Sequence, residues 1–239
     1  GEEGLRYVKV KATRGFWGVL WSNADTDEHG CWNILIRRYN SRRAKAKIVF
    51  RDRVHDRMVI RSFRGARFWN VFLKPVKHKF RLRRRNRTWN NICIRLEDTN
   101  DDNSQDREGF VSALTNNAVH EYYDDFTDMP SPGKINILVQ NVSRAGNAAP
   151  MFSQIDQNSF NLNEIPFFLS LPHIIFDNTK PDMLLYFGEP ENEGEGNGPP
   201  DVIRPSDRFR STVYHELLHV SQFTELVPEW WRSNIDFLI

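Results

Sequence analysis

Two histidines four residues apart, with a glutamate between them, stand near the C-terminal end of this sequence. The stretch is Tyr214-His215-Glu216-Leu217-Leu218-His219-Val220. Residues four apart on a helix project from the same side, so His215 and His219 could share one metal ion. Zn2+ lowers the pKa of a bound water to ~7, and Glu216 would take a proton from that water and pass it to the leaving amine. The stretch therefore predicts a zinc site with His215 and His219 as metal ligands and Glu216 as the catalytic base.

A helix is needed to bring the two histidines to the same side, and the flanking residues predict one. Pro205 and Ser206 are typical of a helix start, with Ser206 as the N-cap and Asp207 in the first turn, where the helix dipole favours an acid. No glycine or proline follows up to Phe223, and apolar residues recur at helical spacing: Phe209, Val213, Leu217 and Val220. The alternative is a buried helix with hydrogen-bonded histidines. Two histidines and an acid are costly to bury without a partner such as a metal.

The His-Glu-x-x-His pattern at residues 215–219 resembles that of the zincin metallopeptidases. The expected elements before it also resemble the N-terminal subdomain of zincins, where a mixed sheet lies against a backing helix and the active-site helix. These elements are a helix over 108–126, strands over 134–140 and 173–176, and a strand or short helix over 183–187. The resemblance implies an α+β zincin-like domain and a peptide or protein substrate, held along an edge strand such as 173–176.

The third zinc ligand is left open by the sequence. Catalytic zinc usually has three protein ligands and keeps the fourth position for water. Metzincins continue the motif through a glycine to a third histidine, but here Gln222 and Glu225 stand at those positions. Without the glycine, we expect the helix to continue and to carry Glu225 off the metal face. Gluzincins take a glutamate from a later helix, which leaves Glu225, Glu229 or a residue beyond Ile239 as the candidates.

Charge divides the chain into two halves. Of its 239 residues, those through Arg95 include 25 lysines and arginines against 7 acids, and the rest include 8 against 24. Such a split predicts two folding units. The basic half could bind nucleic acid or another polyanion, but its basic residues are spread along most of the expected strands, as on the solvent face of a sheet. We therefore keep nucleic-acid binding only as an alternative.

The N-terminal half predicts a β-sandwich. Its expected strands lie over 5–10, 32–36, 46–50, 59–60 and 71–73, with a turn at Glu28-His29-Gly30. The hairpin carrying Thr26-Asp27-Glu28-His29-Gly30, followed by Lys47-Ile48-Val49-Phe50, resembles the carboxypeptidase regulatory-like, transthyretin-like sandwich. That resemblance implies an accessory domain without catalytic residues. The expected organisation is a β-sandwich over 1–80, a linker over 81–106 and the zincin-like domain over 107–239, truncated if the third ligand lies beyond it.

Other candidate residues are assigned structural roles. His29, His55 and His78 are isolated in the sequence, and His120 lies on the expected helix as a surface or packed residue. Asp98, Asn100 and Asp102 match the first ligand positions of a calcium loop, but Asn103 and Gly109 replace the required glycine and glutamate, so a solvated linker is favoured. Cys31 and Cys93 are expected to be buried thiols, although a disulfide between them is an alternative.

The function predicted from these patterns is zinc-dependent peptide hydrolysis. Val227-Pro228-Glu229-Trp230-Trp231 resembles the segment after the motif in zincins of bacterial surface lipoproteins. This resemblance implies a secreted, cell-surface or periplasmic protein, with a lipid anchor outside this chain. The alternatives are a catalytically inactive zincin-fold binding protein and polyanion binding by the basic half. The sequence leaves substrate specificity and oligomeric state open.

Overall fold

The computed structural model describes residues 4–14, 19–34, 44–62, 76–81, 104–131, 133–140, 149, 151, 181–186 and 206–226. These residues form a mixed α/β fold with a seven-stranded sheet and two helices. None of the helices in these ranges is long and apolar enough to span a membrane. The elements in chain order are β1 (Val8–Arg14), β2 (Val19–Asp25), β3 (Ala44–Asp52), β4 (Met58–Ser62), β5 (Lys77–Arg81), α1 (Ser104–Asp125), β6 (Ile135–Gln140), β7 (Met183–Tyr186) and α3 (Ser206–Glu225).

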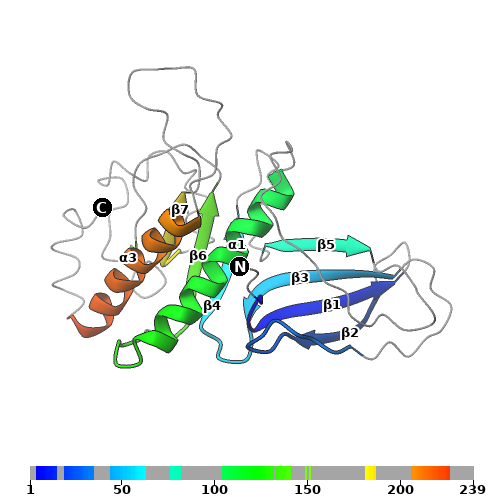
Figure 1. Ribbon diagram of the computed structural model, residues 1–239, viewed down its shortest axis with the longest axis horizontal. Coiled ribbons are helices and arrows are strands. Elements are labelled where there is room, and N and C mark those ends of the chain that lie inside the picture. The colour runs from blue at the N-terminus through cyan, green and yellow to red at the C-terminus, as the bar shows by residue number, and fades with distance from the viewer. Residues whose placement is uncertain are drawn as a thin grey trace, which may run out of the picture.

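The sheet has two parts that join at β3. Strands β1, β2, β3 and β5 pair antiparallel, whereas β4, β6 and β7 run parallel to one another. β3 belongs to both parts, because its residues 45–49 pair with β5 and Arg51 pairs with Val59 of β4. In Figure 1 the antiparallel strands extend away from the helices, while β4, β6 and β7 lie next to them.

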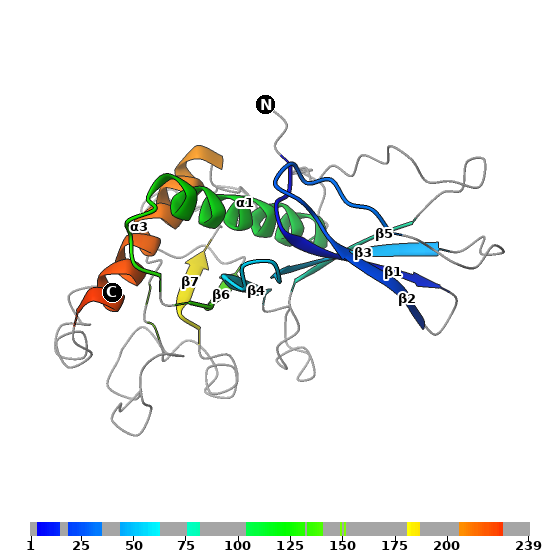
Figure 2. The same cartoon turned by 90° about the horizontal axis from the view of Figure 1, so that it is seen from below.

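Helices α1 and α3 lie side by side on one face of the parallel strands (Figures 1 and 2). The hydroxyls of Tyr122 on α1 and Ser221 on α3 are hydrogen-bonded at 3.2 Å, and Tyr214 on α3 donates to Glu121 on α1 at 3.0 Å. The sheet and both helices supply the core, which includes Met58, Ile60, Val111, Val119, Ile135, Ile137, Met183, Leu185, Phe209, Val213, Leu217 and Val220. This core fixes the position of α3, the helix that carries the two predicted metal ligands.

Strand β6 is the centre of the parallel part. Ile135, Ile137, Leu138 and Val139 are at most 3% exposed, as expected for a strand with neighbouring strands on both sides and its two faces covered. Asp182, just before β7, accepts the backbone N–H of Asn136 at 2.8 Å. The strand predicted over 134–140 is confirmed, and residues 183–186 form a strand rather than a short helix.

The N-terminal half differs from the predicted sandwich. β4 pairs in parallel with β6 of the C-terminal half, with Met58 opposite Ile135. Its first three residues are all buried, a pattern typical of a strand covered on both faces. A separate sandwich followed by a separate zincin-like domain is therefore not confirmed. The boundaries at residues 80 and 107 stay a prediction, and residues 82–103 of the linker lie outside the described ranges.

The individual strand predictions of the N-terminal half have mixed outcomes. The strands expected near 5–10, 46–50 and 59–60 are confirmed as β1, β3 and β4, and the turn at residues 28–30 is present, with Gly30 at φ 76°. Residues 32–34 are not a strand, and β2 and β5 were not predicted. Residues 71–73 lie outside the described ranges. Cys31 is exposed and free rather than buried, and Cys93 lies outside the described ranges.

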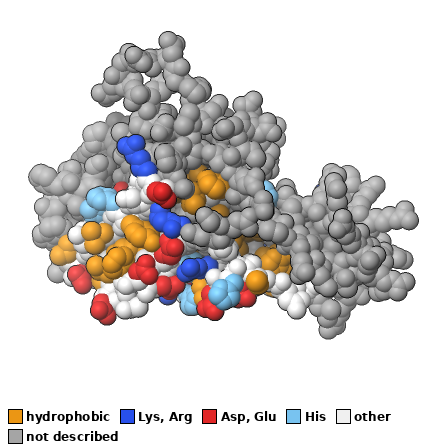
Figure 3. Space-filling view, in the orientation of Figure 1, with side chains coloured by type: hydrophobic (Ala, Val, Ile, Leu, Met, Phe, Trp, Pro, Cys, Tyr) orange, Lys and Arg blue, Asp and Glu red, His pale blue; other side chains and the backbone are white. Residues whose placement is uncertain are grey.

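Both predicted helices of the C-terminal half are confirmed. α1 begins at Ser104, earlier than expected, so residues 104–109 of the alternative calcium loop are helical. α3 runs from Ser206 to Glu225, with Asp207 in its first turn. Figure 3 shows acidic, basic and histidine side chains interspersed with hydrophobic ones on the face over the two helices. The predicted edge strand at residues 173–176 lies outside the described ranges.

Candidate functional site

Helix α3 presents its histidines beside a buried stripe. The predicted stripe residues Phe209, Val213, Leu217 and Val220 are all 0% exposed and belong to the core. His215 is exposed and His219 is partly buried. The core therefore holds the helix in place while solvent reaches His215 and part of His219.

The two histidines, hereafter the histidine pair, point their Nε2 atoms at each other. The Nε2 atoms of His215 and His219 are 3.1 Å apart, and the two rings are nearly perpendicular, at 88°. Zn–N bonds of about 2.0–2.1 Å in a tetrahedral site would place two ligand nitrogens about 3.3 Å apart. The separation of the two nitrogens therefore matches that of two ligands of one zinc ion, and the rings would turn to replace their mutual hydrogen bond with bonds to the metal.

Gln222 orients one member of the pair. Nδ1 of His219 lies 3.1 Å from Oε1 of Gln222, an atom that can only accept a hydrogen bond, so Nδ1 carries the proton and Nε2 keeps its lone pair. A hydrogen bond from the far ring nitrogen to an acceptor is how metal-binding histidines are usually held. Burial lowers the pKa of His219, an effect that His215 reinforces and Gln222 opposes. The lower pKa favours the neutral imidazole that a metal requires.

Glu216 is a buried acid that lies between the two histidines in the sequence. It directly follows His215, lies three residues before His219, and is only 4% exposed, so it shares a helix face with His219. Its Oε2 has no hydrogen-bond partner among the described residues. Burial raises the pKa of Glu216 to about 7. A carboxyl group with a pKa near neutrality is suited to accept and return a proton under physiological conditions.

The described residues supply no third ligand for the histidine pair. Glu225 is the last residue of α3 and is exposed, and at 3.6 residues per turn it projects about 120° away from His219. The expectation that the helix would carry Glu225 away from the metal face is confirmed. Glu229 lies outside the described ranges, so it and residues beyond Ile239 remain candidates.

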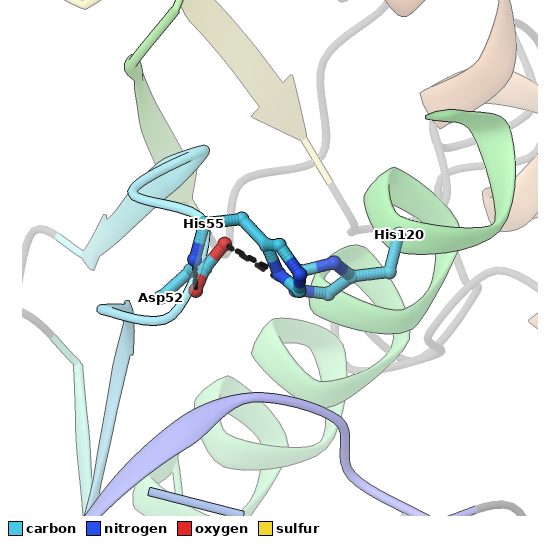
Figure 4. Close-up of side chains that lie close together, drawn as sticks. All are labelled: Asp52, His55 and His120. Atoms are coloured by element: carbon cyan, nitrogen blue, oxygen red, sulfur yellow. Dashed lines mark hydrogen bonds and ion pairs between the residues drawn. The ribbon is translucent and has the colours of Figure 1, made fainter. Parts of the chain in front are cut away.

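A second group of metal-binding residue types lies where the turn between β3 and β4 meets α1. Asp52, His55 and His120 offer ligand atoms that are all within 4.8 Å of one another, close enough to bind a metal ion (Figure 4). Asp52 Oδ2 lies 3.8 Å from His55 Nδ1 and 3.9 Å from His120 Nε2. Asp52 and His120 are 0% exposed, whereas the ring of His55 reaches solvent.

Sequence reasoning missed this second group. His55, isolated in the sequence, was assigned a structural role, and His120 was predicted to be a surface or packed residue; the structure buries His120 and brings both rings to Asp52. His55 lies in the turn between β3 and β4, and His120 lies far along the chain on α1. Only the Asp-x-x-His spacing of Asp52 and His55 was visible in the sequence. The packing of α1 against the β3–β4 turn was not.

No known protein family matches this chain, and the curated proteins and solved structures contain no match to it either. Function is therefore proposed from the chemistry of the two sites.

Proposed function

We propose that this protein is a zinc-dependent metallopeptidase. His215 and His219 would hold Zn2+, Glu216 would act as the general base, and the substrate would be a peptide or protein. The observation that carries the proposal is the convergence of the two Nε2 atoms at 3.1 Å, with Gln222 fixing the tautomer of one ring. In the metal-free protein this contact is a hydrogen bond between the two rings, and zinc would replace its proton.

The roles follow from the side chains themselves. Zn2+, when bound, would lower the pKa of a water and polarise the substrate carbonyl. Oε2 of Glu216 is buried and has no hydrogen-bond partner among the described residues, so it is free to accept a proton. Burial raises the pKa of this carboxyl to about 7 in the metal-free protein, and a protonated Glu216 would pass its proton to the leaving amine. The same burial keeps bulk water away from the carboxyl.

The test is to measure metal content and peptide cleavage together. The full chain should retain zinc after dialysis and cleave an unstructured protein such as casein. His215→Ala should lose cleavage and the zinc ion held by the histidine pair, so that its zinc content falls by one ion per chain. Glu216→Gln should keep the zinc but lose at least about 100-fold in cleavage rate, the usual contribution of a general base. His29→Ala is the matched control, because this exposed histidine pairs with Glu28 and its loss should change neither property.

Two outcomes would replace the proposal with another function. Zinc bound by the histidine pair without any cleavage would favour an inactive binding protein of the same fold. Absence of zinc, together with nucleic-acid affinity that falls steeply with salt, would favour polyanion binding by the basic half. Cleavage that survives Glu216→Gln would remove Glu216 as the base.

A further inference from the structure

We propose that Asp52, His55 and His120 form a second zinc site, independent of the histidine pair, that ties the β3–β4 turn to helix α1. Two imidazole nitrogens and one carboxylate oxygen are a donor set typical of zinc, whereas calcium and magnesium prefer oxygen ligands alone. The three side chains converge from two elements in Figure 4.

The carboxylate of Asp52 is already oriented to bind a metal ion together with the two histidines. Its Oδ1 accepts the backbone N–H groups of Val54 at 2.9 Å and His55 at 3.0 Å, and its Oδ2 accepts that of Arg57 at 3.2 Å. These bonds shape the turn and hold Oδ2 toward both histidines. Ligands held by surrounding hydrogen bonds in this way lose little freedom when a metal binds.

His120 has an unsatisfied nitrogen at the centre of the group. Its side chain is 0% exposed, and its Nε2 has no hydrogen-bond partner among the described residues. Oδ2 of Asp52, at 3.9 Å, is too far away for a hydrogen bond. A buried polar atom without a partner is destabilising, and a metal ion between Nε2 and Oδ2 would give Nε2 its partner.

Small movements would complete the coordination. Ligand atoms of a tetrahedral zinc ion lie about 3.3 Å apart, and the distances from Asp52 Oδ2 to the two histidines are 3.8 and 3.9 Å. His55 can supply much of this change because its ring lies in a turn and is exposed. Tyr7 packs edge-on against His55 and His120, with ring centroids 4.5 and 4.9 Å away, and keeps the rings together. The exposed side of His55 leaves room for a water as the fourth ligand.

Arg57 opposes metal binding at this site. Its Nη1 lies 3.4 Å from Nδ1 of His120, and because a guanidinium only donates, Nδ1 accepts and the proton of a neutral His120 sits on Nε2. A metal on Nε2 requires that proton to move to Nδ1. Arg57 must then turn away, and Asp124 Oδ1, at 3.2 Å from Nη1, is already in place to receive it. Arg57 should therefore lower the affinity of this site for zinc without preventing zinc from binding.

The experiment isolates this site in the full-length double variant His215→Ala/His219→Ala. Equilibrium dialysis against zinc should give two ions per wild-type chain and one per double variant. Adding His55→Ala should lower the remaining affinity by at least about tenfold, and this variant should fold, since the ring is exposed. Adding His29→Ala instead, as the matched control, should change nothing.

Two further measurements separate metal binding from a purely structural role of the group. Zinc should raise the melting temperature of the double variant, because an ion that binds only the folded state stabilises it, and should not do so after His55→Ala. Arg57→Gln should tighten zinc binding about tenfold, since the glutamine carbonyl can accept the Nδ1 proton. No zinc in the double variant, or zinc binding that is indifferent to His55→Ala, would overturn the second site. Zinc binding that is unchanged between wild type and double variant would refute the histidine pair instead.

Discussion

Replacing Glu216 with glutamine should change how the stability of the metal-free protein depends on pH. Burial raises the pKa of Glu216 from 4.5 to about 7, so between these values the native state holds a proton that the unfolded state has lost. The free energy of unfolding therefore falls as pH rises through this window and levels off above it. At 1.36 kcal/mol per pKa unit, the total change is ~3 kcal/mol. A glutamine at this position does not titrate, so the variant should lack this fall.

The assay is urea unfolding at pH 4.5, 6 and 8 in the presence of a chelator, followed by tryptophan fluorescence. At pH 4.5 the free energies of unfolding of wild type and Glu216→Gln should differ little. At pH 8 the variant should be more stable by up to ~3 kcal/mol. Glu225→Gln is the matched control, because it removes the same charge from an exposed position of the same helix. Its effect should stay within about 0.5 kcal/mol at every pH.

Parallel stability curves for wild type and Glu216→Gln would refute the reasoning, since they would mean that Glu216 titrates alike in the folded and unfolded states. Repeating the measurement with zinc adds a second check. A cation beside the carboxyl favours its charged form, so saturating zinc should shrink the difference at pH 8. A difference that zinc leaves unchanged would place the ion away from Glu216.

Three other changes test the same architecture. Gln222→Ala should weaken zinc binding by the histidine pair about 10- to 100-fold in equilibrium dialysis, because it removes the acceptor that fixes one ring. Leu217→Ala should lower the free energy of unfolding by about 2–5 kcal/mol. Leu218 is 38% exposed, against 0% for Leu217, so Leu218→Ala should lower it by less than about 1 kcal/mol. Equal losses would contradict the orientation of the helix. Asp182→Ala should cost about 1–3 kcal/mol in urea unfolding, because it leaves the N–H of Asn136 without its acceptor.

The parts of the structure that depend on local pattern were predictable. Helix α3 combines a start signal at residues 205–207 with a regular apolar stripe, and Phe209 and Val213 lie in the core as expected. Strand β6 was predictable because a short run of apolar residues bounded by turn residues is typical of a buried strand. The geometry of the histidine pair was also implied, since helical spacing alone brings side chains four apart to the same face.

The parts that depend on contacts distant in sequence were not predictable. The pairing of β4 with β6 joins Met58 to Ile135, and no local signal distinguishes that partner from an antiparallel neighbour. The approach of His55 to His120 depends on how α1 packs against the turn after β3. Charge could not reveal this pairing either: opposite net charges predicted two folding units, but hydrogen bonding between strands follows backbone geometry and apolar burial.

The shared sheet also bears on how the chain is made in the cell. β4 leaves the ribosome long before β6, its parallel partner, has been synthesised. During that interval the nascent chain carries an apolar strand, Met58-Val59-Ile60, with unsatisfied backbone amides on one edge. Open strand edges of this kind associate readily with other chains. We therefore expect synthesis of the first half to pass through an aggregation-prone stage that ends when the residues around Ile135 arrive.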